Sequence, residues 1–495
     1  MKKLVVTTVI LAAVMLLPGN VSAQYRDKAA EDAPKTKTDL LLEEAGKAQQ
    51  PVVITLEQAL EIALSENVSV KVADLEIKRT EYAKKGTYAA LFPQIDLSAA
   101  YQRTIKKQVM YMDFDMSSIM PSIPGSGSGE GSEETPGAGS SSSSNDGMEV
   151  GRLNTLNGGV TAALPIINAQ LWKGIKLSGL DVELAVEKAR ASRLDMVTQV
   201  KNAFFGILFA KEALNVYEQV YDNAVKNYDE TKKKYDAQKV SEFELIRAKT
   251  TVANAIPNVY NAESSVVLAL WQLKAVLGVD LDLNLDVAGK LEDWSGQMFY
   301  DIHQHDSVSL DRNSTMKQLA IQTEVLAENI KMQKYACIPS LALAFNFSMN
   351  TMANDVSFSE FRWTPYSYVG LSLNIPIFAG GKRYQAIRQA KNQYQQMQLQ
   401  MDNTERQLKI AIRQSLTTME TNMKSYYAAQ DAVAAAQKAY DIAEAAYKVG
   451  RSTLIELNDA QLALTQSQLA QSQAVYNFIV AKAQLEQTIG QDFIN

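Results

Sequence analysis

The chain has 495 residues, a formal net charge of −6, one cysteine and two histidines. A single cysteine excludes an intrachain disulfide, and the mildly acidic balance gives no reason to expect nucleic acid as a partner. The sequence has few candidate general bases and no serine, cysteine or carboxylate constellation beside one. We therefore do not expect an enzyme, and no cofactor is expected.

Residues 1–23 have the pattern of a secretory signal peptide. Two lysines precede an apolar run that ends at Leu17, and small residues follow it. The only cysteine is Cys337, far from this run, so lipid anchoring is not expected. Residues 24–54 are interpreted as an N-terminal leader. No later stretch has the roughly 18 to 20 uninterrupted apolar residues of a transmembrane helix, so any membrane insertion must use strands.

One pattern occurs twice, in a first repeat at 55–280 and a second at 306–492, with a connector at 281–305 between them. Residues 235–280 and 447–492 align without a gap and share ten identities. Each repeat is predicted to run helix, strand, strand, helix, helix. The expected helices are 55–90, 169–238 and 241–278, then 312–336, 380–448 and 452–489. The expected strands are about 93–112 and 152–168, then 339–350 and 366–378, and a Gly/Ser-rich surface loop is expected at 121–147.

The expected strands alternate apolar with polar or small residues, which gives one apolar face and one polar face that can contact water. Membrane barrel strands require this pattern, but a soluble β-sandwich has it too. Aromatic residues near the strand ends favour a membrane barrel over a β-sandwich, because they would form a belt at the membrane interface. These residues are Tyr101, Tyr111, Phe361, Trp363, Tyr366 and Tyr368. Four strands are too few to close a barrel, and an open edge in lipid would leave backbone groups unpaired. The barrel must therefore be shared between chains.

The helices are long enough to cross a periplasm, since 169–238 would span about 100 Å. In the second repeat a coiled-coil seam is predicted, formed by Tyr426, Ala429, Val433, Ala436, Tyr440, Ala443 and Tyr447, with Leu462, Leu469 and Tyr476 on the returning helix. In the turn between these helices Gly450 is expected to take a positive φ, where the first repeat has Gln238. Pro257 is expected to kink the returning helix of the first repeat.

These residues resemble the outer membrane efflux protein family, the TolC-like channels, over nearly all of the chain from Thr55 to Gly490. The similar segments are ITLEQALEIALSENVSVKVADLEIKRTEYAKKGTYAALFPQIDLSAAY, KYACIPSLALAFNF, LSLNIPIFAGGKRY and YKVGRSTLIELNDAQLALTQSQLA, and their order is the specific feature. The resemblance implies an α+β membrane protein, in which four strands per chain form a shared twelve-stranded β-barrel in a homotrimer. The barrel would lie in the outer membrane of a Gram-negative bacterium and continue into a long α-helical periplasmic barrel.

The family's tunnel entrance is constricted by acidic residues just past the second helical turn, and these match Glu456 and Asp459. They lie three apart on one helical face, so a trimer would bring six carboxylates into one ring. Repulsion within such a ring is tolerable only if the carboxylates stay hydrated or bind cations. The alternative interpretation is an ordinary solvated helix face.

The family also latches its entrance shut by bonds between the two helix pairs. The matching acid is Glu244 and the matching tyrosine is Tyr447, which are expected to share a hydrogen bond. Where the best-known members carry a latching arginine this chain has Ser452, with Arg451 one place earlier. A shift of one residue turns a helical side chain by about 100°, so the latch departs from the family pattern here.

The turns resemble the tips that meet a periplasmic adaptor (membrane fusion) protein. The second tip, with Val449, Gly450, Arg451 and Thr453, fits the family pattern and is the expected contact. The first tip, with Lys239 and Val240, lacks the glycine. The alternative is that both polar turns contact only water.

The leading functional hypothesis is a passive exit duct for small molecules, surrounded by outer-membrane lipid and supplied by an inner-membrane pump through the adaptor. A duct for type I protein secretion stays open, because pump and adaptor carry the specificity. A periplasmic coiled-coil scaffold without a pore is an alternative of another class. His303 and His305 in the connector are interpreted as solvated loop residues, so no metal site is expected.

Overall fold

The computed structural model describes residues 51–110, 148–299, 310–354 and 362–491. The expected signal peptide, most of the leader, the Gly/Ser-rich loop at 121–147 and the pair His303 and His305 lie outside these residues. The chain divides into two compact units. We call residues Glu81–Leu180 and Val325–Tyr394 the sheet unit, and the remainder the helical unit.

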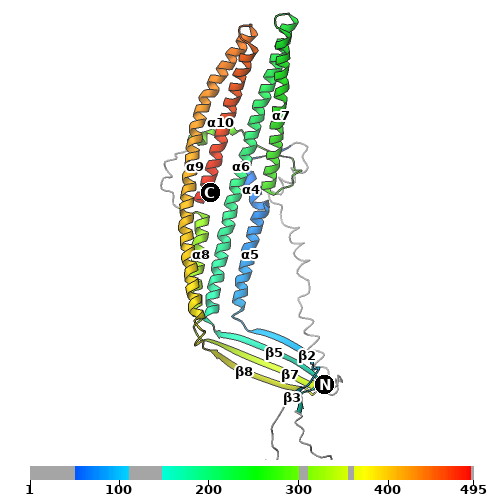
Figure 1. Ribbon diagram of the computed structural model, residues 1–495, viewed down its shortest axis with the longest axis vertical. Helices are drawn as coiled ribbons and strands as arrows, with labels where there is room; N and C mark the ends of the chain where they lie inside the picture. The colour runs from blue at the N-terminus through cyan, green and yellow to red at the C-terminus, as the bar shows by residue number, and fades with distance from the viewer. Residues whose placement is uncertain (1–50, 111–147, 300–309, 355–361, 492–495) are drawn as a thin grey trace, which may run out of the picture. The chain divides into compact units, whose positions relative to one another are not determined.

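The sheet unit contains one antiparallel sheet of four strands in the order β2, β5, β7, β8 (Figure 1). The strands are β2 (Gln94–Arg103), β5 (Asn154–Ile167), β7 (Ser340–Ala353) and β8 (Thr364–Asn374). A small hairpin, β3 (Gln108–Met110) with β4 (Met148–Val150), lies apart from this sheet in the pairing pattern. The range 93–112, expected as one strand, is therefore two.

The strand register places apolar side chains in rows across one face of the sheet. Ile95 pairs with Ala162, Ala162 with Phe345, and Phe345 with Val369. On the opposite face the next row is polar, since Asp96, Thr161, Asn346 and Tyr368 are partners in turn. Side chains alternate across a strand, so this register gives the whole sheet one apolar and one polar face.

The helices form long antiparallel pairs. Their bounds are α4 (Leu56–Glu66), α5 (Val68–Ala89), α6 (Ala169–Asp236), α7 (Glu242–Leu277), α8 (Ser314–Tyr335), α9 (Lys382–Lys448) and α10 (Leu454–Ile489). Within the described residues, no helix is both long and apolar enough to span a bilayer. Pro257 lies inside α7, which continues through it.

One expectation about the helices is wrong. The range 55–90 is not one helix, because Asn67 takes an extended conformation between α4 and α5. The connector at 281–305 contains two short elements, β6 (Leu285–Val287) and the 3₁₀ helix η2 (Leu291–Phe299). Strand β1 (Val52–Ile54), from the expected leader, pairs in parallel with β6. Buried Ile54, Leu285 and Leu291 bring both segments into the main core.

One asparagine arrangement occurs twice in the helical unit. Asn67 Nδ2 donates to the Val276 carbonyl at 2.7 Å, and Asn67 Oδ1 accepts from the Ser69 amide. Asn313 Nδ2 donates to the Thr488 carbonyl at 2.6 Å, and Asn313 Oδ1 accepts from the Met316 amide. Each carbonyl lies two residues before the glycine that ends the helix, Gly278 in α7 and Gly490 in α10. The side chain thus caps one helix start and ties it to another helix end.

The expected seam on α9 is buried or partly buried, with Tyr440 and Tyr447 in a compact cluster beside α10. The facing series on α10 is wrong at Leu462, whereas Leu469 and Tyr476 are partly buried. Leu462 is 56% exposed, whereas Leu457 and Leu464, also seven apart, are buried in the cluster. Both leucine series have the spacing of a coiled coil, and only the packing partner decides which one turns inward.

Candidate functional site

The two helical turns line one cleft of about 440 Å³ in the helical unit. The turn from α6 to α7 contributes Lys239 and Val240, and the turn from α9 to α10 contributes the run from Val449 to Thr453. Lys234, Glu244, Tyr447 and Lys448 complete the lining. The structure thus brings together all residues predicted for the tips and the latch.

The same cap ends α6 and α9, although only one of them has glycine. Gln238 and Gly450 take left-handed φ angles of 58° and 77°. The next amide in each turn reaches back five residues, Lys239 N to Lys234 O and Arg451 N to Ala446 O, both at 2.8 Å. This is the Schellman arrangement, in which glycine is favoured because it has no Cβ. Gln238 is the only residue other than glycine with a positive φ in the described part of the chain.

Replacing Gln238 with glycine is expected to stabilise the first turn by about 1 kcal/mol, because the left-handed conformation then has no Cβ clash. Hydrogen exchange of the Lys239 amide, which bonds Lys234, should slow about five-fold. Gly450→Gln is the matched reverse variant and should speed exchange of the Arg451 amide by a similar factor. Unchanged rates in both variants would show that the turns carry no such strain.

Tyr447, which lines the cleft, holds α9 against α6. Its hydroxyl lies 2.5 Å from Thr231 Oγ1, which donates its own proton to the Asn227 carbonyl at 2.7 Å. Tyr447 must therefore be the donor to Thr231. Lys234 Nζ donates to the Tyr447 carbonyl at 2.5 Å and lies 4.1 Å from the ring centroid. These contacts hold Tyr447 in a fixed position, and its side chain is buried.

The predicted hydrogen bond between Glu244 and Tyr447 is absent from this chain, because Thr231 takes the tyrosine hydroxyl. Burial raises the pKa of Tyr447 above its ordinary value, the hydrogen bond to Thr231 lowers it, and the nearby charges of Glu244 and Glu230 raise it further. Glu244 and Arg451 both line the cleft, and neither makes an ion pair within the residues that the structure describes. Both charges remain available to another molecule.

Glu456 and Asp459 lie outside the cleft lining and are exposed. Glu456 Oε2 accepts from the Thr453 amide at 3.0 Å and from Ser452 Oγ at 2.5 Å, while Thr453 Oγ1 accepts from the Glu456 amide. This is a capping box at the start of α10. The bond from Ser452 is the main cause that holds the pKa of Glu456 below its ordinary value. Ser452, predicted for the latch, therefore serves the cap of its own helix.

The predictions from sequence missed Thr231 and Lys234, which fix Tyr447. Thr231 is fully buried near the C-terminal end of α6, and a threonine is a poor helix former. A threonine in a long helix is the only local sign in the sequence that this residue has a special role, and it does not indicate which residue Thr231 bonds. Among the described residues no group of three or more His, Cys, Asp or Glu side chains is placed to hold a metal.

The chain matches the model of the family described as outer membrane efflux protein over residues 135–279 and 307–491. Outer membrane protein TolC of Escherichia coli (strain K12) is 20% identical over 356 residues, which cover 68% of this chain and 71% of that protein. Outer membrane efflux protein BepC of Brucella suis biovar 1 (strain 1330) is 30% identical over 163 residues, which cover 33% of this chain and 35% of that protein.

Solved channel structures share the fold. The Campylobacter jejuni CmeC outer membrane channel superposes with a TM-score of 0.66 at 17% identity, covering 90% of this chain and 91% of that chain. The outer membrane protein VceC from Vibrio cholerae gives a TM-score of 0.64 at 15% identity, covering 88% and 96%.

Proposed function

This chain belongs to the outer membrane efflux protein family, and on that premise we propose that three copies form the passive exit duct of a tripartite export system. Members of this family are transport channels, so the chain is an outer-membrane efflux channel and not an enzyme. In the proposal a periplasmic adaptor joins the duct to an inner-membrane pump, which supplies the energy. The cargo is small molecules that the pump passes on.

The observation that carries the trimeric duct is the four-stranded sheet. Its order leaves β2 and β8 as edges, and one of its faces is apolar along all four strands. An apolar face suits lipid, but an unpaired edge does not, because its backbone groups would have no partner there. Pairing β2 of one copy with β8 of the next removes every edge, and three copies supply twelve strands.

Disulfide crosslinking between the sheet edges tests this arrangement. Within one chain two strands separate β2 from β8, or about 14 Å, which is too far for a disulfide. In a Cys337→Ser background, Leu97→Cys is combined in turn with Val369→Cys, Leu371→Cys and Leu373→Cys. We expect at least one pair to give dimers and trimers on a denaturing gel after mild oxidation of outer membranes.

The matched control pairs Ala162→Cys with Phe345→Cys, which are direct partners on β5 and β7. This pair should close within each chain and leave the monomer size unchanged. Monomers alone from every β2–β8 pair would refute the shared barrel, and a ladder that continues past three would refute the trimer.

The cleft between the turns supports the proposal for the adaptor contact. Val449 is exposed at the second tip, and Glu244 and Arg451 offer unpaired charges of both signs beside it. Lys239 and Val240 extend the same surface on the first tip. A partner that places a helical turn here would find apolar and charged contacts together. In the same proposal Glu456 and Asp459 of three copies form the acidic ring at the entrance.

The repeated asparagine arrangement supports an internal duplication. Asn67 and Asn313 each make two hydrogen bonds of the same kind, one to the carbonyl two residues before Gly278 or Gly490 and one to an amide at the start of the following helix. One such arrangement in each half makes two per chain and six in three copies, which would give the helical barrel a near six-fold repeat. That regularity is what a continuous wall of paired helices needs.

A further inference from the structure

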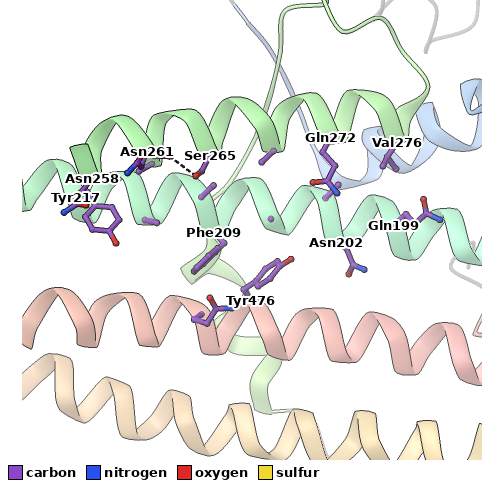
Figure 2. A pocket seen from close by; sticks show the side chains of 17 residues that line it. Gln199, Asn202, Phe209, Tyr217, Asn258, Asn261, Ser265, Gln272, Val276 and Tyr476 are labelled. Atoms are coloured by element: carbon purple, nitrogen blue, oxygen red, sulfur yellow. Dashed lines mark hydrogen bonds between the residues drawn. The ribbon is translucent and has the colours of Figure 1, made fainter. Parts of the chain in front are cut away.

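A cavity of about 790 Å³ lies between α6, α7 and α10 in the helical unit (Figure 2). Its floor on α6 is a row of small residues, which includes Ala203, Gly206 and Ala210. Side chains of α7 form one wall, and Gln473 and Tyr476 of α10 form the other. The volume lies within the range of about 300 to 1,000 Å³ that small-molecule sites occupy.

The lining mixes apolar side chains with uncharged polar ones and carries no charge, although 21% of the chain is charged. Four of its amide side chains make no hydrogen bond to any described residue, namely those of Asn202, Asn258, Asn261 and Gln272. Asn202 Oδ1 is also buried from water. Since a half-turn about χ2 exchanges the oxygen and nitrogen of an amide, Asn202 can present either to the cavity. A buried amide without a partner costs about 1 to 3 kcal/mol, which a ligand would recover.

Aromatic side chains add a second element of recognition. Phe209 and Tyr476 stack at 5.4 Å between ring centroids, with 21° between the ring planes. Figure 2 shows both rings beside the cavity, with the amides of Asn202 and Gln272 nearby. Burial raises the pKa of Tyr476, so its hydroxyl stays protonated at neutral pH. A flat ring has a stacking partner here, and its polar substituents have amides within reach.

We propose that this cavity binds uncharged aromatic molecules that carry an N–H or O–H donor. A charged ligand would lose hydration without meeting a counter-charge, whereas a neutral donor satisfies the amide oxygens. None of the lining residues is among those proposed above for the acidic ring, the latch or the tips. A further consequence rests on the proposed export function. If the chain is an export duct, neutral aromatic compounds are one class of its cargo, and they bind in this cavity as they pass through.

The test uses the purified full chain in lipid nanodiscs and the probe N-phenyl-1-naphthylamine, which is neutral and has one N–H donor. Its fluorescence should rise with saturable binding. Gly206→Leu should weaken the affinity on the order of tenfold or more, because an added Cβ points at Tyr476 Oη from 3.9 Å and a larger side chain fills the space. Tyr476→Phe removes one hydroxyl and should weaken it about five-fold.

Two controls separate the site from general partitioning. Gly174→Leu makes the same change in the same helix, where an added Cβ meets nothing within 4 Å, and should leave binding unchanged. The second control is 8-anilinonaphthalene-1-sulfonate, which has the same rings with a negative charge and should bind at least about tenfold more weakly.

Binding that does not saturate, or that Gly206→Leu, Tyr476→Phe and Asn202→Leu all leave unchanged, would overturn the inference. The same holds if the anionic probe binds as tightly as the neutral one, or if a neighbouring copy occupies the cavity and no probe binds. Conductance of the same preparation is measured in planar bilayers. Conduction without probe binding overturns only this inference, whereas binding without conduction counts against the proposed duct.

Discussion

Gly490→Ala is expected to remove almost all folded protein from the outer membrane. An added Cβ would lie 2.2 Å from the Arg312 carbonyl oxygen and 2.7 Å from its carbon, so the backbone would have to move. That backbone is held in place, because Arg190 donates to the carbonyls of both Arg312 and Gly490. The φ of 76° adds about 1 to 2 kcal/mol for any residue with a Cβ. The amount of heat-modifiable oligomer in outer-membrane fractions measures the effect.

The chain provides graded controls for this prediction. Gly450→Ala has the same left-handed strain, with φ of 77°, but an added Cβ meets nothing within 4 Å. It should therefore cost only about 1 kcal/mol and leave oligomer levels close to normal. Gly278→Ala should fall between the two, since its Cβ would lie 2.9 Å from Asn67 Cα. Equal levels for Gly490→Ala and Gly450→Ala would mean that the contact with Arg312 is not needed.

Regular patterns in the sequence locate most of the fold, because each follows from one periodicity. The alternation at 339–350 and 366–378 corresponds to β7 and β8, which differ from these ranges by a few residues at their ends. The long helical pattern at 169–238 corresponds to α6, which ends two residues earlier. Such elements are specified locally, by side chains that repeat every two or every three to four residues.

Features that depend on a distant partner were not predictable. The burial of Leu464 in preference to Leu462 depends on which face α9 covers, and both residues suit a helix. The break at Asn67 depends on the Val276 carbonyl, 209 residues away. At the candidate site, sequence patterns located the turns and the residues that line the cleft. They misassigned the partner of Tyr447, because Thr231 reaches it only through the packing of α6 on α9.

Neutralising the proposed acidic ring is expected to relieve block of the channel by divalent and trivalent cations. The double variant Glu456→Gln, Asp459→Asn removes six charges from a trimer, and the half-blocking concentration should rise on the order of tenfold or more. Glutamine is preferred to alanine, because Glu456 accepts from the Thr453 amide in the capping box and glutamine preserves that bond. Planar-bilayer recordings provide the measurement. Block that is unchanged in the double variant would remove both residues from the entrance.

The pH dependence of block separates Glu456 from its neighbours in the ring. In an Asp459→Asn background only Glu456 remains of the pair, and block should disappear as falling pH protonates it. The hydrogen bond from Ser452 lowers the pKa of Glu456, so the carboxylate persists to a lower pH than it would otherwise. Ser452→Ala removes this main cause and should move the loss of block to higher pH. A midpoint that does not move, or that moves to lower pH, would show that block does not depend on the ionisation of Glu456.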